Sequence, residues 1–181
     1  WLEDEDFDIL KRHGVTVACC PASNLKLASG YANVPKMLES GINVALGTDG
    51  AASNNNLNIM QDMYLFGVVY KGYFRDPTII TPAEVLHAAT RAGALSQGRD
   101  DSGLLAVGMR ADLCVLNTDT PQFTPMTSAA CNVVYAAQGA DIRMTMVDGE
   151  ILYRDGEFKT IDIEKVKAEV QRRTDSILSR L

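Results

Sequence analysis

Residues 44–50 read VALGTDG, and residues 51–56 continue as AASNNN. An apolar run, a glycine-flanked polar turn and a Ser/Asn cluster, in that order, predict a buried strand, a tight turn and a helix start. Asp49 would then lie at the carboxyl end of a strand, where α/β folds carry their chemistry. Gly47 and Gly50 let the backbone bend and let a ligand or metal approach closely. The alternative is that Asp49 only caps the next helix.

The composition of the chain is that of an ordinary globular protein. Its 181 residues suffice for one domain or for parts of two, and 46% of them are hydrophobic and 22% charged. The formal net charge of −6 argues against nucleic acid and anionic membranes as partners. No apolar run approaches the roughly 18 residues that a membrane span needs, and no signal-peptide pattern is present.

The cysteines and the first residue each support one further expectation. Cys19, Cys20, Cys114 and Cys131 show neither a CxxC pair nor a Cys/His metal spacing. Reduced thiols of this kind are typical of a cytoplasmic protein, which we therefore expect. The chain opens on Trp1 without an initiating methionine, so we expect a fragment or a processed piece.

The first hundred residues alternate between apolar strands and helices. Strands are predicted over 15–20 and 42–46, and both are apolar nearly throughout, as parallel strands covered on both faces are. Residues 21–30 are predicted to form a polar loop. The predicted helices cover residues 3–12, 34–40, 57–73 and 81–97. Strands that alternate with helices indicate right-handed parallel crossovers, and the methionine-rich 57–73 segment is expected to pack in a core.

From about Gly103 the predicted segments change from mostly helices to mostly strands. Strands are predicted over 111–116 and 142–146, and Asp148-Gly149 is a strong signal for a two-residue hairpin turn. A short helix is expected over 130–137, and residues 162–181 show the apolar stripe of an amphipathic helix. We therefore expect three regions: residues 1–103, a small and mostly β region 104–160, and a terminal helix 161–181.

Several motifs together resemble a known family. They are PASNLKLASG at 21–30, GTDGAASNN at 47–55, VGMRADL at 107–113 and VDG at 147–149. In this spacing they resemble the amidohydrolase superfamily, and within it the branch of S-adenosylhomocysteine/5′-methylthioadenosine deaminases and triazine chlorohydrolases. The resemblance covers essentially the whole chain.

The resemblance implies an α/β fold of a particular kind. It implies the C-terminal portion of a (β/α)8 metal-dependent hydrolase barrel, with its last two strands and helices. Part of a small β-sandwich built from both ends of the chain, and a C-terminal helix, would follow. Residues 15–20 and 42–48 would correspond to the seventh and eighth barrel strands.

The resemblance also assigns a role to Asp49. In the family, the aspartate that ends the eighth strand binds the catalytic divalent metal, usually zinc with iron as the alternative, and carries a proton. Such a metal lowers the pKa of bound water towards ~7, and a carboxylate beside it can pass the proton to departing ammonia. The implied reaction is hydrolytic deamination of a small purine-like substrate, S-adenosylhomocysteine or 5′-methylthioadenosine, by metal-bound hydroxide.

Other polar residues follow the same two strands. Ser23, Asn24, Ser53 and Asn54 are candidates for substrate binding, and Lys26 could contact a polar group of the substrate. For Ser53 and Asn54, helix capping and turn formation are an equal alternative, and a loop lysine is usually only solvated.

The cysteine pair departs from the family pattern. The family often has His-Asn before this proline, where this chain has Cys19-Cys20. That difference leaves the substrate open, because the histidine lines the pocket. A thiolate could ligate zinc in its place, while a buried neutral thiol is the favoured interpretation.

The metal ligands that the family uses elsewhere are missing from this chain. They are a His-x-His pair on the first strand and histidines on strands five and six. The chain has only His13 and His87, neither of which follows a predicted strand. A catalytic zinc site usually needs about three protein ligands. We therefore expect an incomplete site that is inactive alone and is completed by the remainder of the same polypeptide.

Several alternatives stay open. The chain could belong to another amidohydrolase, such as a triazine chlorohydrolase or a guanine or cytosine deaminase. It could also be a non-catalytic half-protein that assembles with a separate N-terminal chain. A homo-oligomer is compatible with each of these.

Overall fold

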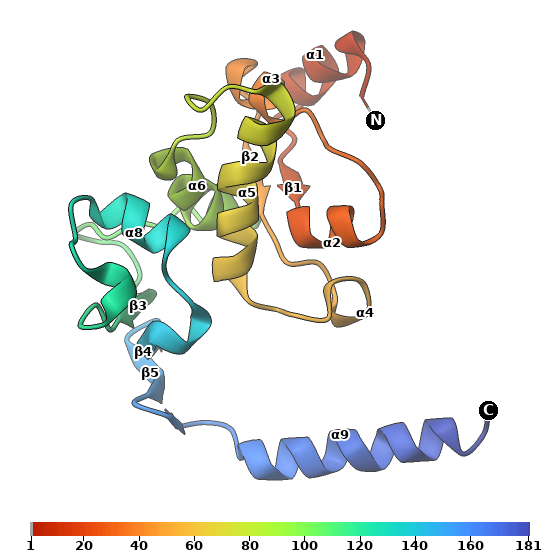
Figure 1. Ribbon diagram of the computed structural model, residues 1–181, viewed down its shortest axis with the longest axis vertical. Helices are drawn as coiled ribbons and strands as arrows, with labels where there is room; N and C mark the ends of the chain where they lie inside the picture. Colours follow the sequence, from red (N-terminus) through yellow and green to blue (C-terminus); the bar gives the residue numbers. More distant parts are fainter. Residues whose placement is uncertain (1) are drawn as a thin grey trace. The chain divides into compact units, whose positions relative to one another are not determined.

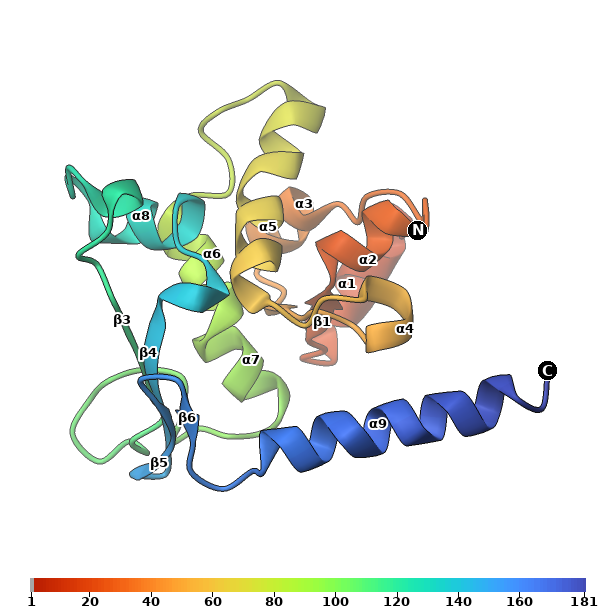
Figure 2. The same ribbon diagram turned by 60° about the horizontal axis from the view of Figure 1, so that its bottom comes forward.

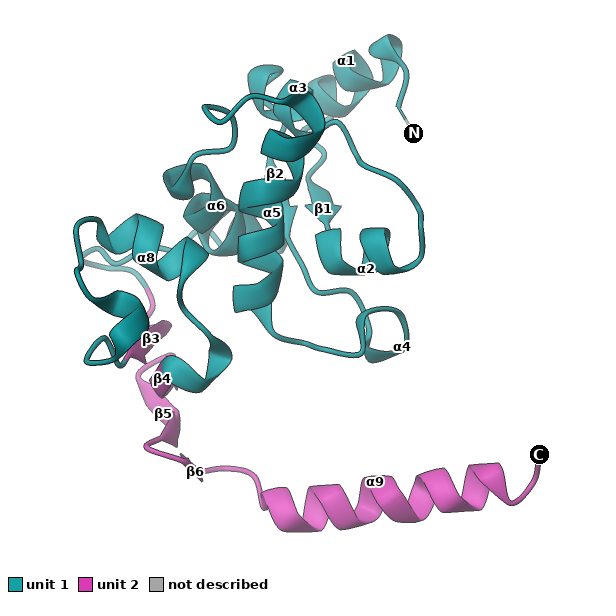
Figure 3. Ribbon diagram, viewed as in Figure 1, with its two compact units in different colours: residues 1–109, 117–141 teal, residues 110–116, 142–181 magenta. Residues whose placement is uncertain are grey.

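The computed structural model describes residues 2–181, which form two compact units (Figures 1 and 3). Unit 1 comprises residues 1–109 and 117–141, and unit 2 comprises residues 110–116 and 142–181. The expectation drawn from Trp1 depends on a residue outside the described range.

Unit 1 consists of two short strands and a series of helices, with two 3-10 turns near its end. In chain order these are α1 (Asp4–Arg12), β1 (Val17–Cys19), α2 (Pro21–Lys26), α3 (Val34–Glu39), β2 (Val44–Leu46), α4 (Ala51–Asn54), α5 (Ile59–Phe74), α6 (Pro82–Ala89), α7 (Arg91–Ser96), η1 (Pro121–Phe123), α8 (Ala129–Tyr135) and η2 (Gly139–Asp141). Unit 2 contains β3 (Leu113–Leu116), β4 (Ile142–Val147), β5 (Glu150–Arg154), β6 (Glu157–Phe158) and α9 (Ile163–Leu178).

The two strands of unit 1 are parallel, as predicted. Ala18 pairs with Ala45, and the backbone N–H of Gly47 donates to the carbonyl of Cys19 over 2.9 Å just beyond the ladder. Both strands therefore end at the same edge. The chain segments that leave this edge, α2 after β1 and α4 after β2, lie side by side in Figures 1 and 2. The stretch around Asp49 is thus brought next to α2.

Helices pack against the strand pair and bury the core of unit 1. Its fully buried members include Val34, Phe66 and Val85, and Met63 of α5 is also buried. Full burial of a large apolar side chain contributes about 1.5–3 kcal/mol. The prediction that the methionine-rich helix packs in a core is therefore confirmed. Ala18, in the middle of β1, remains exposed.

The prediction of a polar loop over 21–30 is wrong in its first half. Residues 21–26 form α2, which Pro21 opens in the first turn. Proline suits that position because its ring fixes a helical φ and its missing N–H would have no partner there. Pro21, Ala22 and Ser23 are buried, so the inward face of this short helix consists of small residues that show no apolar periodicity.

Two predicted helix boundaries also need correction. The AASNNN segment does not begin the long helix: α4 ends at Asn54, its C-cap Asn55 has a φ of 66°, and α5 starts separately after the cap Asn58. The helix predicted to run to residue 97 is broken at Thr90, which has φ −127° and ψ −85°. The Thr90 hydroxyl donates to the carbonyl of Leu86 over 2.6 Å, and such side-chain bonding competes with the helix ladder.

Unit 2 is an antiparallel sheet in the order β3-β4-β5-β6, followed by α9. The predicted turn at Asp148-Gly149 is confirmed, because the φ angles of these residues are 52° and 82° and β4 pairs with β5 across them. Positive φ at both positions is the type I′ geometry that suits hairpin twist. Asp162 caps α9 by accepting from the N–H of Lys165 over 3.0 Å.

No helix among residues 2–181 combines the length and the apolarity needed to cross a bilayer.

Candidate active site

Asp49 lies just beyond β2 and is exposed, yet its carboxylate is held from two sides. Oδ2 accepts a hydrogen bond from the Ser23 hydroxyl over 2.7 Å, and Oδ1 accepts from the backbone N–H of Gly50 over 2.7 Å. The φ of Asp49 is 62°, in the left-handed region that residues other than glycine rarely adopt. Asp49 does not occupy the position that the simple capping alternative requires, because Gly50 is the N-cap residue of α4.

These hydrogen bonds also set the charge of the site. The Ser23 hydroxyl, followed by the Gly50 N–H, holds the pKa of Asp49 below its ordinary value, and Ser53 adds to the effect. Donors aimed at a carboxylate stabilise its ionised form. Asp49 is therefore an anionic oxygen donor at neutral pH, and each of its oxygens keeps a lone pair for a further partner.

A buried hydrogen-bond network supports the backbone on both sides of Asp49. Asn54 donates its side-chain amide to the carbonyl of Thr48 over 2.7 Å and to Asp62 Oδ2 over 3.1 Å. The other oxygen of Asp62 accepts from the backbone N–H of Ala22 over 3.0 Å. Asp62 is fully buried, and its burial raises its pKa more than these two donors lower it.

Sequence reasoning missed Asp62. Its partners lie 40 and 8 residues away, so no local motif marks it. The available signal was one acidic side chain among Met60, Met63 and Phe66 on the apolar face of α5.

Lys26 and Ser53 join the ends of α2 and α4. The Lys26 ammonium donates to the carbonyl of Ser53 over 2.8 Å and also to the side-chain oxygen of Asn55. In this structure Lys26 therefore holds the end of α2 against the end of α4.

The structure brings together Ser23, Ser53 and Asn54 around Asp49, but it does not place Asn24 in that cluster. Asn24 is half-buried and lines a surface crevice together with Tyr31 and Tyr70. The substrate-binding roles of these residues remain predictions.

The two adjacent cysteines have different surroundings. Cys19 is buried and shares a 3.2 Å hydrogen bond with the Tyr70 hydroxyl, and burial raises its pKa to about 11. Cys20 lies at the edge of the site near Asp49, and burial raises the pKa of its thiol. A Cβ on Gly47 would come within 3.2 Å of the Cys20 sulfur, so glycine permits this close approach. Cys19, whose pKa burial raises well above neutral pH, is a neutral core residue.

Binding of a metal at Asp49 depends on which other side chains could hold the ion with it. Among residues 2–181, no three His, Cys, Asp or Glu side chains are grouped so that they could hold a metal ion together. His13 and His87 are both exposed, on the end of α1 and on α6. Asp49 fits a metal as a single anionic ligand.

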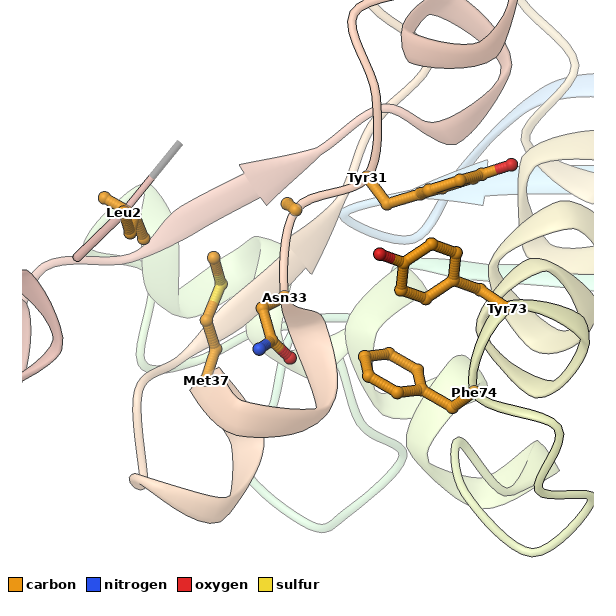
Figure 4. A pocket seen from close by; sticks show the side chains of 7 residues that line it. Leu2, Tyr31, Asn33, Met37, Tyr73 and Phe74 are labelled. Atoms are coloured by element: carbon orange, nitrogen blue, oxygen red, sulfur yellow. The ribbon is translucent and has the colours of Figure 1, made fainter. Parts of the chain in front are cut away.

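A pocket lined by aromatic side chains is a separate feature of unit 1. Figure 4 shows it between the segment that precedes α3 and the end of α5, with Tyr31, Tyr73 and Phe74 on one side. Its volume is about 260 Å³, and the Tyr31 and Tyr73 rings are 4.9 Å apart between centroids. It shares no lining residue with the Asp49 cluster.

Comparison with known families matches the amidohydrolase family over residues 1–152. This chain belongs to the amidohydrolase family. The match covers β1, β2 and the whole Asp49 cluster, and the family predicted from the motifs at 21–30 and 47–55 is confirmed.

Curated relatives of this amidohydrolase chain carry names of adenosine-type deaminases. A 5′-deoxyadenosine deaminase of Methanosarcina mazei is 41% identical over 181 residues, which are all of this chain and 42% of the relative. A 5-methylthioadenosine/S-adenosylhomocysteine deaminase of Acetivibrio thermocellus is 44% identical over 178 residues, which are 98% of this chain and 41% of the relative. The chain thus spans about two fifths of the length of these relatives.

Solved structures show the same fold. An adenosine deaminase from Xanthomonas campestris with bound zinc matches with a TM-score of 0.94 and 30% identity, over 98% of this chain and 41% of that one. An atrazine chlorohydrolase from Arthrobacter aurescens complexed with zinc matches with a TM-score of 0.87 and 26% identity, over 95% and 38%. The predicted fold class, an α/β portion of an amidohydrolase, is confirmed.

Proposed function

We propose that the intact protein containing this amidohydrolase chain hydrolytically deaminates adenosine-type nucleosides, such as 5′-methylthioadenosine, S-adenosylhomocysteine and 5′-deoxyadenosine. The observation that carries the proposal is the held, ionised carboxylate of Asp49 at the carboxyl edge of the parallel strands. Relatives that are 41–44% identical and are named as such deaminases support the choice of substrate class.

We further propose that Asp49 is one ligand of a divalent metal, with zinc favoured because the matched solved structures include zinc-bound proteins. The remaining ligands would come from parts of the intact protein outside these 181 residues. When bound, such a metal supplies an activated water at neutral pH and polarises the group under attack.

The residues of this chain would then have the following roles in the reaction. An Asp49 oxygen accepts the proton that water gives up and later delivers it to the amine that leaves as ammonia. Ser23 and Gly50 keep the carboxylate pointing in one direction through both transfers. The Ser23 hydroxyl and the Asn54 amide would hold the carboxylate and its backbone, to which they already donate, and contact of Ser53 and Asn24 with substrate stays a prediction.

A comparison of substrates on the intact protein tests this function. Ammonia release and the absorbance change from adenine to hypoxanthine would be measured for the three nucleosides, with a chlorinated triazine as comparator. We expect deamination of at least one nucleoside, with kcat/KM at least about a hundredfold above that for triazine hydrolysis, since mismatched substrates lose several kcal/mol of transition-state binding. Triazine hydrolysis without nucleoside deamination would contradict the assignment.

A further inference from the structure

We propose that Asp62 of α5 is a positioning residue that fixes the Asp49 carboxylate by clamping the two segments that leave the strand edge. The inference rests on the proposed function in so far as Asp49 is a metal ligand. Asp62 would touch neither metal nor substrate.

The clamp closes a ring of contacts around Asp49. On one side, Asp62 Oδ1 accepts from the N–H of Ala22, and the next residue, Ser23, donates to Asp49 Oδ2. On the other side, Asp62 Oδ2 accepts from Asn54, whose amide also donates to the carbonyl of Thr48, directly before Asp49. One side chain thereby sets both the backbone that carries the carboxylate and the hydroxyl that orients it.

Asp49 needs such support. Its positive φ is unfavourable for a residue with a Cβ, so the backbone would relax if its surroundings allowed it. The side chain is exposed, and packing does not hold it. The hydrogen bonds that Asp62 anchors therefore restrain this geometry together with the bond from the Gly50 N–H to Asp49 Oδ1.

Stability alone does not explain why an aspartate occupies position 62. Asp62 is fully buried on an apolar helix face, and its two partners, the Ala22 N–H and the Asn54 amide, are neutral. A buried carboxylate is tolerated when donors satisfy it, but it gains little over an apolar side chain of similar size. A role in positioning accounts for its presence.

Asp62→Asn in the intact protein tests the clamp, because an amide keeps the shape but can accept from only one of the two donors. The chain offers a matched control in Asp141. Asp141 is also buried, and its carboxylate also accepts from one backbone N–H, that of Gln138 over 2.8 Å, and one side-chain amide, that of Gln122 over 3.0 Å. It shares no contact with the Asp49 cluster, so Asp141→Asn reproduces the loss of a buried carboxylate without disturbing the clamp.

Two readouts separate positioning from stability. In metal-free protein, amide hydrogen exchange of residues 47–56 should be faster in Asp62→Asn and unchanged in Asp141→Asn. In competition with a chelator, the zinc dissociation constant should rise about 10- to 100-fold in Asp62→Asn, as expected for loss of a group that orients a metal ligand. Asp141→Asn should bind zinc as the wild type does, even if its melting temperature falls equally.

A second variant protects the test if Asp62→Asn does not fold. Asn54→Ala cuts the same clamp between Asp62 and Thr48 and should shift both readouts in the same direction. Where both variants fold, the double variant should lose less zinc affinity than the sum of the two single losses, because both changes break one shared network.

The outcomes separate this inference from the proposed function. Unchanged exchange of residues 47–56 and unchanged zinc affinity in Asp62→Asn would overturn the clamp, whatever the activity. A wild-type protein that binds no metal would overturn the metal role of Asp49, and the exchange readout on metal-free protein would still decide the clamp.

Discussion

Asp49 has a strained backbone conformation, with a φ of 62°, and a side chain that two hydrogen bonds hold in one orientation. Aspartate and asparagine tolerate a positive φ better than most residues, since their short polar side chains bond locally. The 2.7 Å contact between Oδ1 of Asp49 and the N–H of Gly50 is such a bond. Asparagine is therefore the variant that best keeps the backbone while removing the anionic oxygens.

Gly103 shows the opposite case, a position where only glycine fits. Its φ is 84°, and a Cβ there would lie 2.7 Å from the Cα of Arg91 and 2.9 Å from the carbonyl oxygen of Thr90. Both are backbone atoms and cannot move aside easily. The guanidinium of Arg91 holds this approach by donating to the carbonyls of Asp100 and Ser102 over 2.9 and 2.6 Å.

We therefore predict that Gly103→Ala destabilises unit 1 by roughly 2–5 kcal/mol, the sum of backbone strain and overpacking. Gly98→Ala is the matched control, because Gly98 also has a positive φ of 69° but no atom within 4 Å of an added Cβ. Its cost should be about 1 kcal/mol. Urea denaturation followed by circular dichroism measures both, and equal midpoints for the two variants would show that the close approach is unimportant.

At the scale of elements, α9 carries an ion-pair cluster that responds to pH. The Glu169 carboxylate accepts from the Arg172 guanidinium and from Arg173 Nε over 2.7–2.8 Å. These two arginines lower its pKa from 4.5 to about 2. Because the pKa is lower in the helix than in the unfolded chain, the pairs stabilise the helix above pH 4.5.

The stabilisation should disappear as the pH falls from 4.5 to about 2. A peptide of residues 161–181 should therefore lose helicity over that range, and its Glu169→Gln variant should lose less. Circular dichroism at each pH measures the difference, which high salt should reduce because these groups are exposed. Identical pH profiles for the two peptides would contradict this account of the cluster.

The elements that sequence reasoning predicted well are those with local signals. The strand before Asp49, the long apolar helix and the Asp148-Gly149 hairpin each follow from neighbouring residues. Helix α2 was missed because its buried face consists of Pro21, Ala22 and Ser23, which lack a hydrophobic period. The helix break at Thr90 could not be predicted, because neither that residue nor its two neighbours are glycine or proline.

The candidate site was predictable only in part, for a similar reason. Asp49 follows from its place after an apolar run, and Ser23 follows from the neighbouring strand. The contact between Ser23 and Asp49 spans 26 residues, and the one between Asp62 and Ala22 spans 40. Pairings over such distances are set by the tertiary fold, so the sequence indicated the residues but not the network.

At the scale of the whole molecule, the described residues hold the Asp49 carboxylate in place but contain no group of three side chains that could bind a metal ion together. The chain spans about two fifths of the length of the deaminases that it resembles. Ala18 in β1 stays exposed, as expected for a strand pair with an uncovered surface. These observations agree with our proposal that residues beyond the 181 of this chain supply the remaining metal ligands.

The most direct measurement of the central claim is the zinc content of the purified proteins, by atomic absorption after exhaustive dialysis. If Asp49 is a metal ligand, the intact wild-type protein retains stoichiometric zinc, whereas Asp49→Asn loses most of it while its circular dichroism spectrum is unchanged. The 181-residue chain produced alone should retain none. An Asp49→Asn protein that keeps its full zinc content and its deaminase activity would contradict the account.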